Sequence, residues 1–314
     1  MGEMFDLLIL GGGPAGMTAG LYASRARLKT KLLERLAPGG QILTTHWVDN
    51  YPGFPEGVSG FELVDRMRRQ SERFGLDIEA GEACSLFRDG DHLVVNLEGG
   101  GSLAAKTVII ATGAQPSKLG IPGEAEMTGR GVSYCATCDG PFYRNAEVAV
   151  VGGGDTAVEE ALFLTRFASR IHLFHRRDEF RAAGILREKV LEEPKIEIHF
   201  SSVLTSILPD ERGLVQRVRC KNLKTGAETE MPVEGVFMFV GQKPITSFLV
   251  GFVDLDHQGF VKTDGEMRTN QPGVLAAGDV RVKRLRQVST AVGDGATAAY
   301  SAEKYLEEKS CGNV

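Results

Sequence analysis

Two cysteines separated by two residues and followed at once by an acid are the residues of this chain best suited to chemistry: Cys135, Cys138 and Asp139. Thiols at this spacing can form a reversible disulfide, and their proximity can lower the pKa of one thiol and make it more nucleophilic. Asp139 could exchange the proton that thiol chemistry requires, or it could cap the N-terminus of a helix. Half of a zinc site has the same spacing, so the pair alone leaves redox and metal chemistry both open.

The elements that must position this pair include a Gly-rich turn near the start of the chain. Phe5–Leu10 is mostly apolar and predicts a buried strand, and Met17–Ala26 predicts a helix. Between them Gly11, Gly13 and Gly16 form G-x-G-x-x-G. In a nucleotide-binding turn the first glycine allows the bend, the second admits a pyrophosphate, and the third lets helix and strand pack closely. The helix N-terminus then faces the anion, and a Gly-rich turn without a ligand is the alternative.

The same strand, turn and helix occur a second time, at Ala146–Val151, Gly152–Ala157 and Val158–Phe167. The second turn has the form G-x-G-x-x-A, and the two copies align without gaps. In the first copy a second strand, expected over Lys29–Leu33, is followed by Glu34. An acid at this distance from the turn is typical of sites that hydrogen-bond an unphosphorylated ribose.

The position aligned with this acid in the second copy is His175, at the end of a strand expected over Ile171–Phe174. Arg176, Arg177 and Arg181 follow it. Arginine can bind a 2′-phosphate in bidentate fashion, whereas a carboxylate would repel one. The first site is therefore predicted to bind FAD or NAD, and the second to bind NADPH. A solvated basic strand end, or NADH in place of NADPH, are the alternatives.

Two further apolar runs, Val108–Gly113 and Gly273–Asp279, end in turns of small residues. The second run precedes a helix expected over Ala291–Leu306. Glycine permits a close approach of a ligand to the backbone, and Asp279 can accept hydrogen bonds from hydroxyl groups. Both strand ends could therefore lie against a long cofactor, although each could equally be a plain boundary between strand and turn.

Length and composition predict a globular protein of about two domains: 314 residues, of which 42% are hydrophobic and 25% charged. The net charge of −5 argues against a nucleic-acid partner. No apolar run approaches the roughly 20 residues needed to cross a membrane. The N-terminus has acids instead of the basic residues of a signal peptide, so we expect a cytoplasmic protein without a membrane partner.

Only two of the five cysteines, Cys135 and Cys138, are close in sequence, which argues against a disulfide scaffold. No second half of a zinc site accompanies them, so no metal is expected. We expect Cys84 and Cys220 to be small buried hydrophobes and Cys311 to be an inert thiol in the tail.

Over essentially its full length the chain resembles the low-molecular-weight thioredoxin reductases of the two-dinucleotide-domain flavoproteins. Besides the motifs above, the resemblance rests on Gly39-Gly40-Gln41, Asn50-Tyr51-Pro52-Gly53, Ala111-Thr112-Gly113, Gly278-Asp279 and Arg286-Gln287. It implies an α/β fold of two Rossmann-like three-layer domains. A discontinuous FAD-binding domain would cover 1–117 and 246–314, and an inserted NADPH-binding domain carrying the redox disulfide would cover 118–245. Pro116–Pro122 and Gly241–Thr246 would be the connecting strands.

The resemblance also implies a homodimeric thioredoxin-disulfide reductase that moves its NADPH domain between two arrangements. Electrons would pass from NADPH through FAD to the pair Cys135–Cys138, and from there to thioredoxin, with Asp139 as acid and base. Cys135 would face outward and Cys138 the flavin. The resemblance, taken with the Gly-rich turn, assigns sixteen residues to FAD. They are Gly11, Gly13, Pro14, Ala15, Gly16, Glu34, Gly40, Gln41, Asn50, Ala83, Thr112, Gly113, Asp279, Arg286, Gln287 and Val288. To NADPH it assigns Gly154, Asp155, Thr156, His175, Arg176, Arg177 and Arg181.

Ile245 and the unusually basic segment Asp279–Leu285 depart from the family pattern. Other functions stay open at this point. A related flavin reductase could serve a peroxiredoxin-type or glutaredoxin-like partner. A zinc-binding module and an NAD(P)-binding redox sensor or scaffold are non-enzymatic alternatives.

Overall fold

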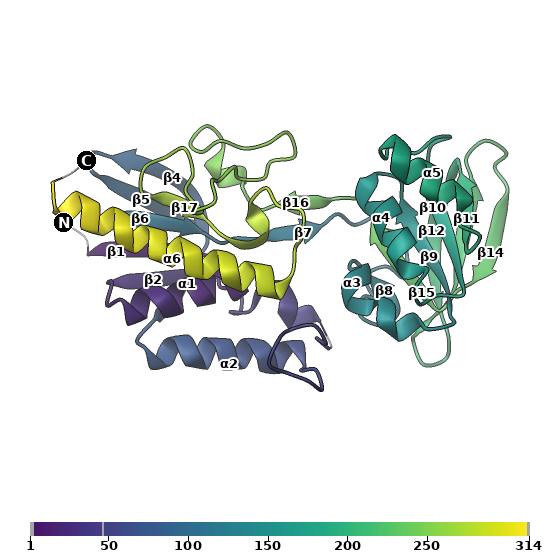
Figure 1. The fold of residues 1–314 in the computed structure, drawn as a ribbon, viewed down its shortest axis with the longest axis horizontal. Coiled ribbons are helices and arrows are strands. Elements are labelled where there is room, and N and C mark those ends of the chain that lie inside the picture. The colour runs from purple at the N-terminus through teal and green to yellow at the C-terminus, as the bar shows by residue number, and fades with distance from the viewer. Residues whose placement is uncertain (1–2, 46, 313–314) are drawn as a thin grey trace. The chain divides into compact units, whose positions relative to one another are not determined.

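The computed structural model describes residues 3–45 and 47–312, with Thr44 described by its backbone only. The chain has a mixed α/β fold with parallel sheets, and it divides into two compact units (Figure 1). Unit 1 comprises Met1–Gln115 and Lys243–Val314, and unit 2 comprises Pro116–Gln242. These limits lie within a few residues of the predicted domain boundaries. Among the described residues no helix is both long enough and apolar enough to span a bilayer.

Unit 1 is built on one sheet with the strand order β3-β2-β1-β6-β5-β4, and β17 pairs with β6. Strands β1, β2, β3, β6 and β17 run parallel, while β4 and β5 form an antiparallel extension. Its elements are β1 (Met4–Leu10), α1 (Pro14–Arg25), β2 (Thr30–Glu34), η1 (Gly40–Thr44), α2 (Gly60–Arg73), β3 (Asp77–Ala80), β4 (Ala83–Asp89), β5 (His92–Leu97), β6 (Ser102–Ile110), η3 (Ser247–Leu249), β17 (Val274–Ala276), η4 (Gly278–Val280) and α6 (Val288–Ser310).

The central strands of unit 1 are apolar on both faces because both faces are covered, as in other parallel sheets. Leu7 and Ile9 of β1 pack with alanines of helices α1 and α6. Leu8 and Leu10 face the other way, into a cluster formed with β4, β5 and the segment that contains Val253. The unit is therefore layered as helices, parallel sheet and antiparallel strands with loops.

Unit 2 repeats the layering on a parallel sheet of order β11-β10-β9-β15-β8. Helix α4 packs on one face, and the antiparallel sheet β12-β13-β14 packs on the other. Its elements are β8 (Val132–Ser133), α3 (Ala136–Asp139), η2 (Gly140–Tyr143), β9 (Glu147–Gly152), α4 (Asp155–Leu164), β10 (Arg170–His175), α5 (Gly184–Glu192), β11 (Ile196–Phe200), β12 (Ser202–Pro209), β13 (Val215–Asn222), β14 (Glu228–Pro232) and β15 (Gly235–Phe239).

Two short strands, β7 (Ala114–Pro116) and β16 (Gln242–Pro244), pair where the chain passes between the units. The strand predicted over Pro116–Pro122 is wrong, since residues 117–122 lie outside any strand. Two prolines without an N–H group, and Gly120 with a φ of 73°, account for the early end of β7.

Three helices, α1, α4 and α6, begin three residues before the predicted positions. The differences for α1 and α6 have a local cause. Helix α1 begins at Pro14, because the fixed φ of proline suits the first helical position. Helix α6 begins at Val288, because Gln287 and Thr290 form a reciprocal capping box there.

One predicted core cysteine is not in the core. Cys220 is buried, as predicted, but Cys84 is exposed. Cys84 lies on β4 at the edge of the sheet, where the register with β5 shifts between Ala83 and Ser85. Leu86 takes the inward position on this strand.

A buried carboxylate anchors helix α6 to the end of β17. Asp294 accepts hydrogen bonds from Arg281 (3.2 Å), Lys283 (2.8 Å) and the backbone N–H of Gly278 (3.1 Å). All three side chains are largely buried. Two basic residues of the segment Asp279–Leu285 are therefore paired with one carboxylate within unit 1.

Replacing Asp294 by Ala should lower the free energy of unfolding by about 3 kcal/mol, because it leaves two buried cations without their counter-ion. Urea denaturation measures this change. Glu307→Ala is the control, since it removes an exposed ion pair with Lys304 on the same helix and should leave the stability close to that of the parent. Equal stability of the two variants would show that the buried network contributes nothing.

Candidate active site

The two active-site cysteines form a disulfide in unit 2. Cys135 and Cys138 are bonded, with their Cα atoms 5.4 Å apart. Cys135 follows β8 directly and occupies the N-cap position of the one-turn helix α3, and Cys138 lies within that helix. Both side chains are partly exposed. A turn of helix thus holds the two sulfurs in bonding contact while leaving them accessible.

Hydrogen-bond donors lie beside the Cys135 sulfur. Cys135 Sγ accepts a hydrogen bond from the backbone N–H of Cys138 at 3.2 Å, and it lies 3.3 Å from the Thr137 hydroxyl. Hydrogen bonds to the charged form of a group lower its pKa. In the reduced protein these donors would stabilise a thiolate on Cys135.

Asp139 ends helix α3 and is partly buried. Burial raises the pKa of its carboxyl, and a hydrogen bond with Ser133 opposes that rise. The alternative role as helix N-cap is not observed, because Cys135 takes that position in α3 and Asp139 makes no side-chain cap to η2. A carboxyl that stays protonated above its ordinary range is suited to donating a proton to a thiolate.

Glu160 is a site residue that the sequence did not reveal. It lies on α4, and the backbone N–H groups of Ala136 and Thr137, in the first turn of α3, lie close enough to its carboxyl to lower its pKa against the larger effect of burial. Burial raises the pKa of Glu160, and its Oε2 atom is buried without a hydrogen bond. Glu160 therefore positions the disulfide turn on helix α4, through a contact that crosses more than 20 residues of sequence.

The Gly-rich turn of unit 1 has the shape that a dinucleotide requires. A Cβ atom on Gly13 would meet nothing within 4 Å, so the space above the N-terminus of α1 is open. The Glu34 carboxylate accepts hydrogen bonds from the backbone N–H of Gly12 at 2.7 Å and of Leu36 at 3.0 Å. The acid therefore lies directly beside the turn, at the end of β2, where a ribose would contact it.

A second part of the predicted FAD site contains a buried oxygen atom, on Asp279, without a hydrogen bond among the described residues. Asp279 Oδ1 is buried and makes no hydrogen bond within the described residues, and burial raises the pKa of this carboxyl. The Arg286 guanidinium lies nearby, with its centre 4.2 Å from the centroid of the Phe260 ring. Gly278, which precedes Asp279, packs against Ala15 at the start of α1. A ligand hydroxyl would satisfy the Asp279 oxygen, so the residues of unit 1 fit FAD.

The remaining residues assigned to FAD lie on several segments of unit 1. Side-chain hydrogen bonds join Asn50 to Gln287 (3.1 Å), Gln41 to the carbonyl of Ala114, and Thr112 to the carbonyl of Ile245 (2.7 Å). Ala83 begins β4, next to Glu82, whose carboxylate lies 3.4 Å from Arg35 at the end of β2. The other assigned residues are Gly11, Pro14 and Gly16 in the turn and α1, Gly40 in η1, Gly113 after β6, and Val288 at the start of α6.

In unit 2 the second Gly-rich turn lies against His175. A Cβ atom on Gly153 would come within 2.2 Å of the His175 ring, so only glycine fits between them. Burial lowers the pKa of His175, and its Nε2 atom is buried without a hydrogen bond. The backbone N–H of Arg181 donates to the Gly153 carbonyl at 2.8 Å. The end of β10, the second Gly-rich turn and the segment that contains the arginines are therefore in contact with one another.

Arg176, Arg177 and Arg181 are exposed, and none forms an ion pair with another described residue. Asp155 begins α4 and accepts a hydrogen bond from the backbone N–H of Ala183 at 2.8 Å. Gly154 is the N-cap of α4, and Thr156 is exposed in its first turn. Three available guanidinium groups beside a helix N-terminus fit the phosphates of NADPH.

The comparisons with known proteins agree with this geometry. The profile of the pyridine nucleotide-disulphide oxidoreductase family matches residues 5–295. A thioredoxin reductase of Peptoclostridium litorale is 47% identical, covering 98% of this chain and 99% of its own, and one of Listeria innocua is 45% identical, covering 98% and 95%. The crystal structure of thioredoxin reductase from Streptococcus pyogenes is 45% identical, covers 97% of this chain and 99% of its own, and superposes with a TM-score of 0.92.

The match extends over most of the chain and includes both Gly-rich turns and the cysteine pair between them. The chain belongs to the pyridine nucleotide-disulphide oxidoreductase family.

Proposed function

We propose that this protein is an NADPH-dependent thioredoxin-disulfide reductase. The observation that carries the proposal is the Cys135–Cys138 disulfide, partly exposed and directly followed by a carboxyl with a raised pKa. It stands in a chain that is 45–47% identical to proteins named thioredoxin reductase over nearly their full length. Thioredoxin is accordingly the proposed partner, in a cytoplasmic homodimer.

The cofactors belong to separate units in this proposal. Unit 1 binds FAD through the Gly11–Gly16 turn, Glu34 and Asp279, and unit 2 binds NADPH through the Gly152–Ala157 turn and the arginines that follow His175. When bound, NADPH supplies a hydride and FAD supplies the electron pair that reduces the disulfide. The raised pKa of the buried Asp279 carboxyl suits a group that exchanges hydrogen bonds with ribityl hydroxyls.

In the reduced enzyme the Cys135 thiolate attacks a sulfur of the substrate disulfide, forming a mixed disulfide and releasing one substrate thiolate. Asp139 protonates the thiolate that leaves. The Cys138 thiolate then attacks Cys135, which restores the Cys135–Cys138 bond and releases the second substrate thiolate. The hydrogen bonds to Cys135 Sγ would stabilise the thiolate that attacks in the first step.

Cys135→Ser should reduce the kcat/KM for thioredoxin by about a thousandfold or more, because the variant lacks the attacking sulfur. NADPH-dependent reduction of thioredoxin, coupled to a disulfide dye, measures the rate. Cys84→Ser is the matched control, since Cys84 is exposed and lies in unit 1, and it should retain the parent rate. Activity of Cys135→Ser equal to that of the parent would refute the dithiol mechanism. If the parent enzyme reduced a glutaredoxin but not thioredoxin, the partner would be reassigned.

Asp139→Asn should lower kcat by about a hundredfold, the usual contribution of a positioned general acid. Because burial raises the pKa of Asp139, the carboxyl remains protonated to a higher pH than an exposed aspartate, and the rate should fall as the pH rises through that pKa. Ser133→Ala removes a hydrogen bond that lowers this pKa, so it should move the alkaline limb of the kcat profile to higher pH. If the alkaline limb of the kcat profile is unchanged in Asp139→Asn, the titrating group that causes this limb is a different residue.

Replacing Arg176, Arg177 and Arg181 together by Ala should raise the KM for NADPH by at least about tenfold, because charge-assisted hydrogen bonds to the 2′-phosphate are lost. The KM for NADH should change little, because NADH lacks that phosphate. Arg212→Ala, another exposed arginine of unit 2, is the control. Equal increases for the two nucleotides would contradict the assignment of NADPH to this strand end.

A further inference from the structure

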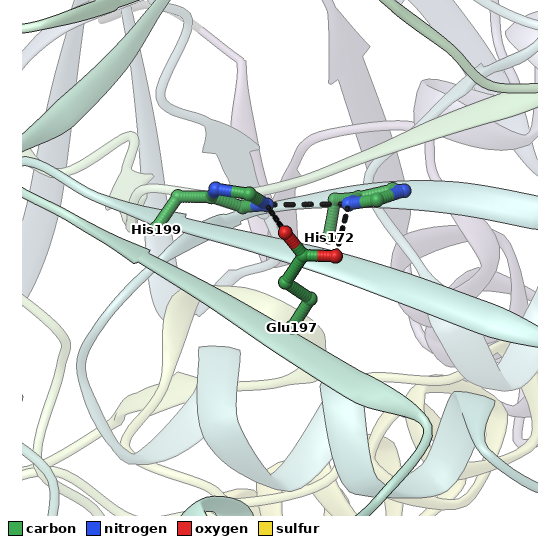
Figure 2. A group of neighbouring side chains, drawn as sticks. All are labelled: His172, Glu197 and His199. Atoms are coloured by element: carbon green, nitrogen blue, oxygen red, sulfur yellow. Dashed lines mark hydrogen bonds and ion pairs between the residues drawn. The ribbon is translucent and has the colours of Figure 1, made fainter.

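Two histidines and a glutamate meet on neighbouring strands of unit 2, apart from the disulfide and from the Gly-rich turn (Figure 2). His172 lies on β10, and Glu197 and His199 lie on β11. The register pairs His172 with Glu197. Residues two apart on a strand share a face, so the three side chains converge.

The distances between their ligand atoms suit a tetrahedral metal ion. His172 Nδ1 lies 3.2 Å from His199 Nε2 and 3.7 Å from Glu197 Oε2, and His199 Nε2 lies 3.6 Å from Glu197 Oε1. Zinc bonds of about 2.0–2.1 Å place tetrahedral ligand atoms about 3.3–3.4 Å apart. Figure 2 shows the two rings directing one nitrogen each toward the carboxylate.

The outer contacts hold the rings in this arrangement. His172 Nε2 lies 3.4 Å from the carboxylate of Glu147, so that its N–H can donate outward and leave Nδ1 free to bind a metal. The His199 ring stacks on Phe174, with centroids 4.6 Å apart. The His172 side chain is 5% exposed and that of Glu197 40%, which places the rings inside and the carboxylate at the entrance.

We propose that His172, His199 and Glu197 form a Zn²⁺ site that joins β10 to β11. Two imidazoles and one carboxylate are a common zinc donor set, and three protein ligands leave one position for water. Arg170 competes for the carboxylate, since its guanidinium lies 2.5 Å from Glu197 Oε2. Zinc bound at this site replaces the hydrogen bond between the two rings and stabilises the folded unit.

Isothermal titration with ZnCl₂ tests the site in the FAD-loaded enzyme, with its disulfide closed and the exposed Cys84 and Cys311 alkylated. We expect one saturable Zn²⁺ per chain. His199→Gln and Glu197→Gln should each weaken binding at least about tenfold. Glu147→Gln should weaken it about tenfold, because the Glu147 carboxylate orients the His172 ring. Arg170→Gln should tighten binding, because it frees the carboxylate.

His92→Gln is the matched control, because His92 lies beside a single carboxylate in unit 1 and should not affect zinc affinity. Retained FAD absorbance and far-UV circular dichroism verify folding. Glu197→Gln keeps the test decisive if His199→Gln misfolds, since the Glu197 side chain is partly exposed. Absence of saturable binding to the parent, or equal affinity in the parent and in a folded Glu197→Gln, would overturn the proposal.

Discussion

The first unit depends on two places where a side chain cannot fit. A Cβ atom on Gly16 would lie 1.8 Å from the carbonyl oxygen of Gly11, and one on Gly11 would lie 2.4 Å from that of Ala111. The first contact brings α1 directly onto the turn that follows β1, and the second brings that turn against the residue that follows β6. The N–H groups of the helix then face the space above the sheet, and Glu34 reaches the same turn. The anion-binding position is thus a consequence of close packing.

The second unit reaches the same shape with a different contact. Its turn ends in Ala157, and Gly153 makes room for the buried ring of His175. The histidine stands where the first unit has an acid, and the arginines after it are exposed. One architecture therefore presents a carboxylate in one unit and guanidinium groups in the other. The different ribose chemistry expected of FAD and NADPH follows from that exchange.

Patterns local in sequence predicted much of the fold and the central motif of the site. The strands β1 and β9, the two turns and the cysteine pair all rest on residues adjacent in the chain. Contacts between segments that are not adjacent in sequence were not predictable in this way. Examples are the contact of Glu160 with the turn that holds the disulfide and the contact of Asp294 with the basic segment Asp279–Leu285. Cys84 shows the same limit, because an edge position and a register shift, not its residue type, decide its exposure.

In the proposed reaction, electrons from NADPH reach the Cys135–Cys138 disulfide. Anaerobic treatment of the FAD-loaded protein with NADPH, followed by alkylation and mass spectrometry of the Cys135–Cys138 peptide, tests it directly. Both cysteines should be protected before NADPH is added, and both should be alkylated afterwards. A flavin that is bleached by NADPH while the disulfide stays protected would contradict the proposed reaction.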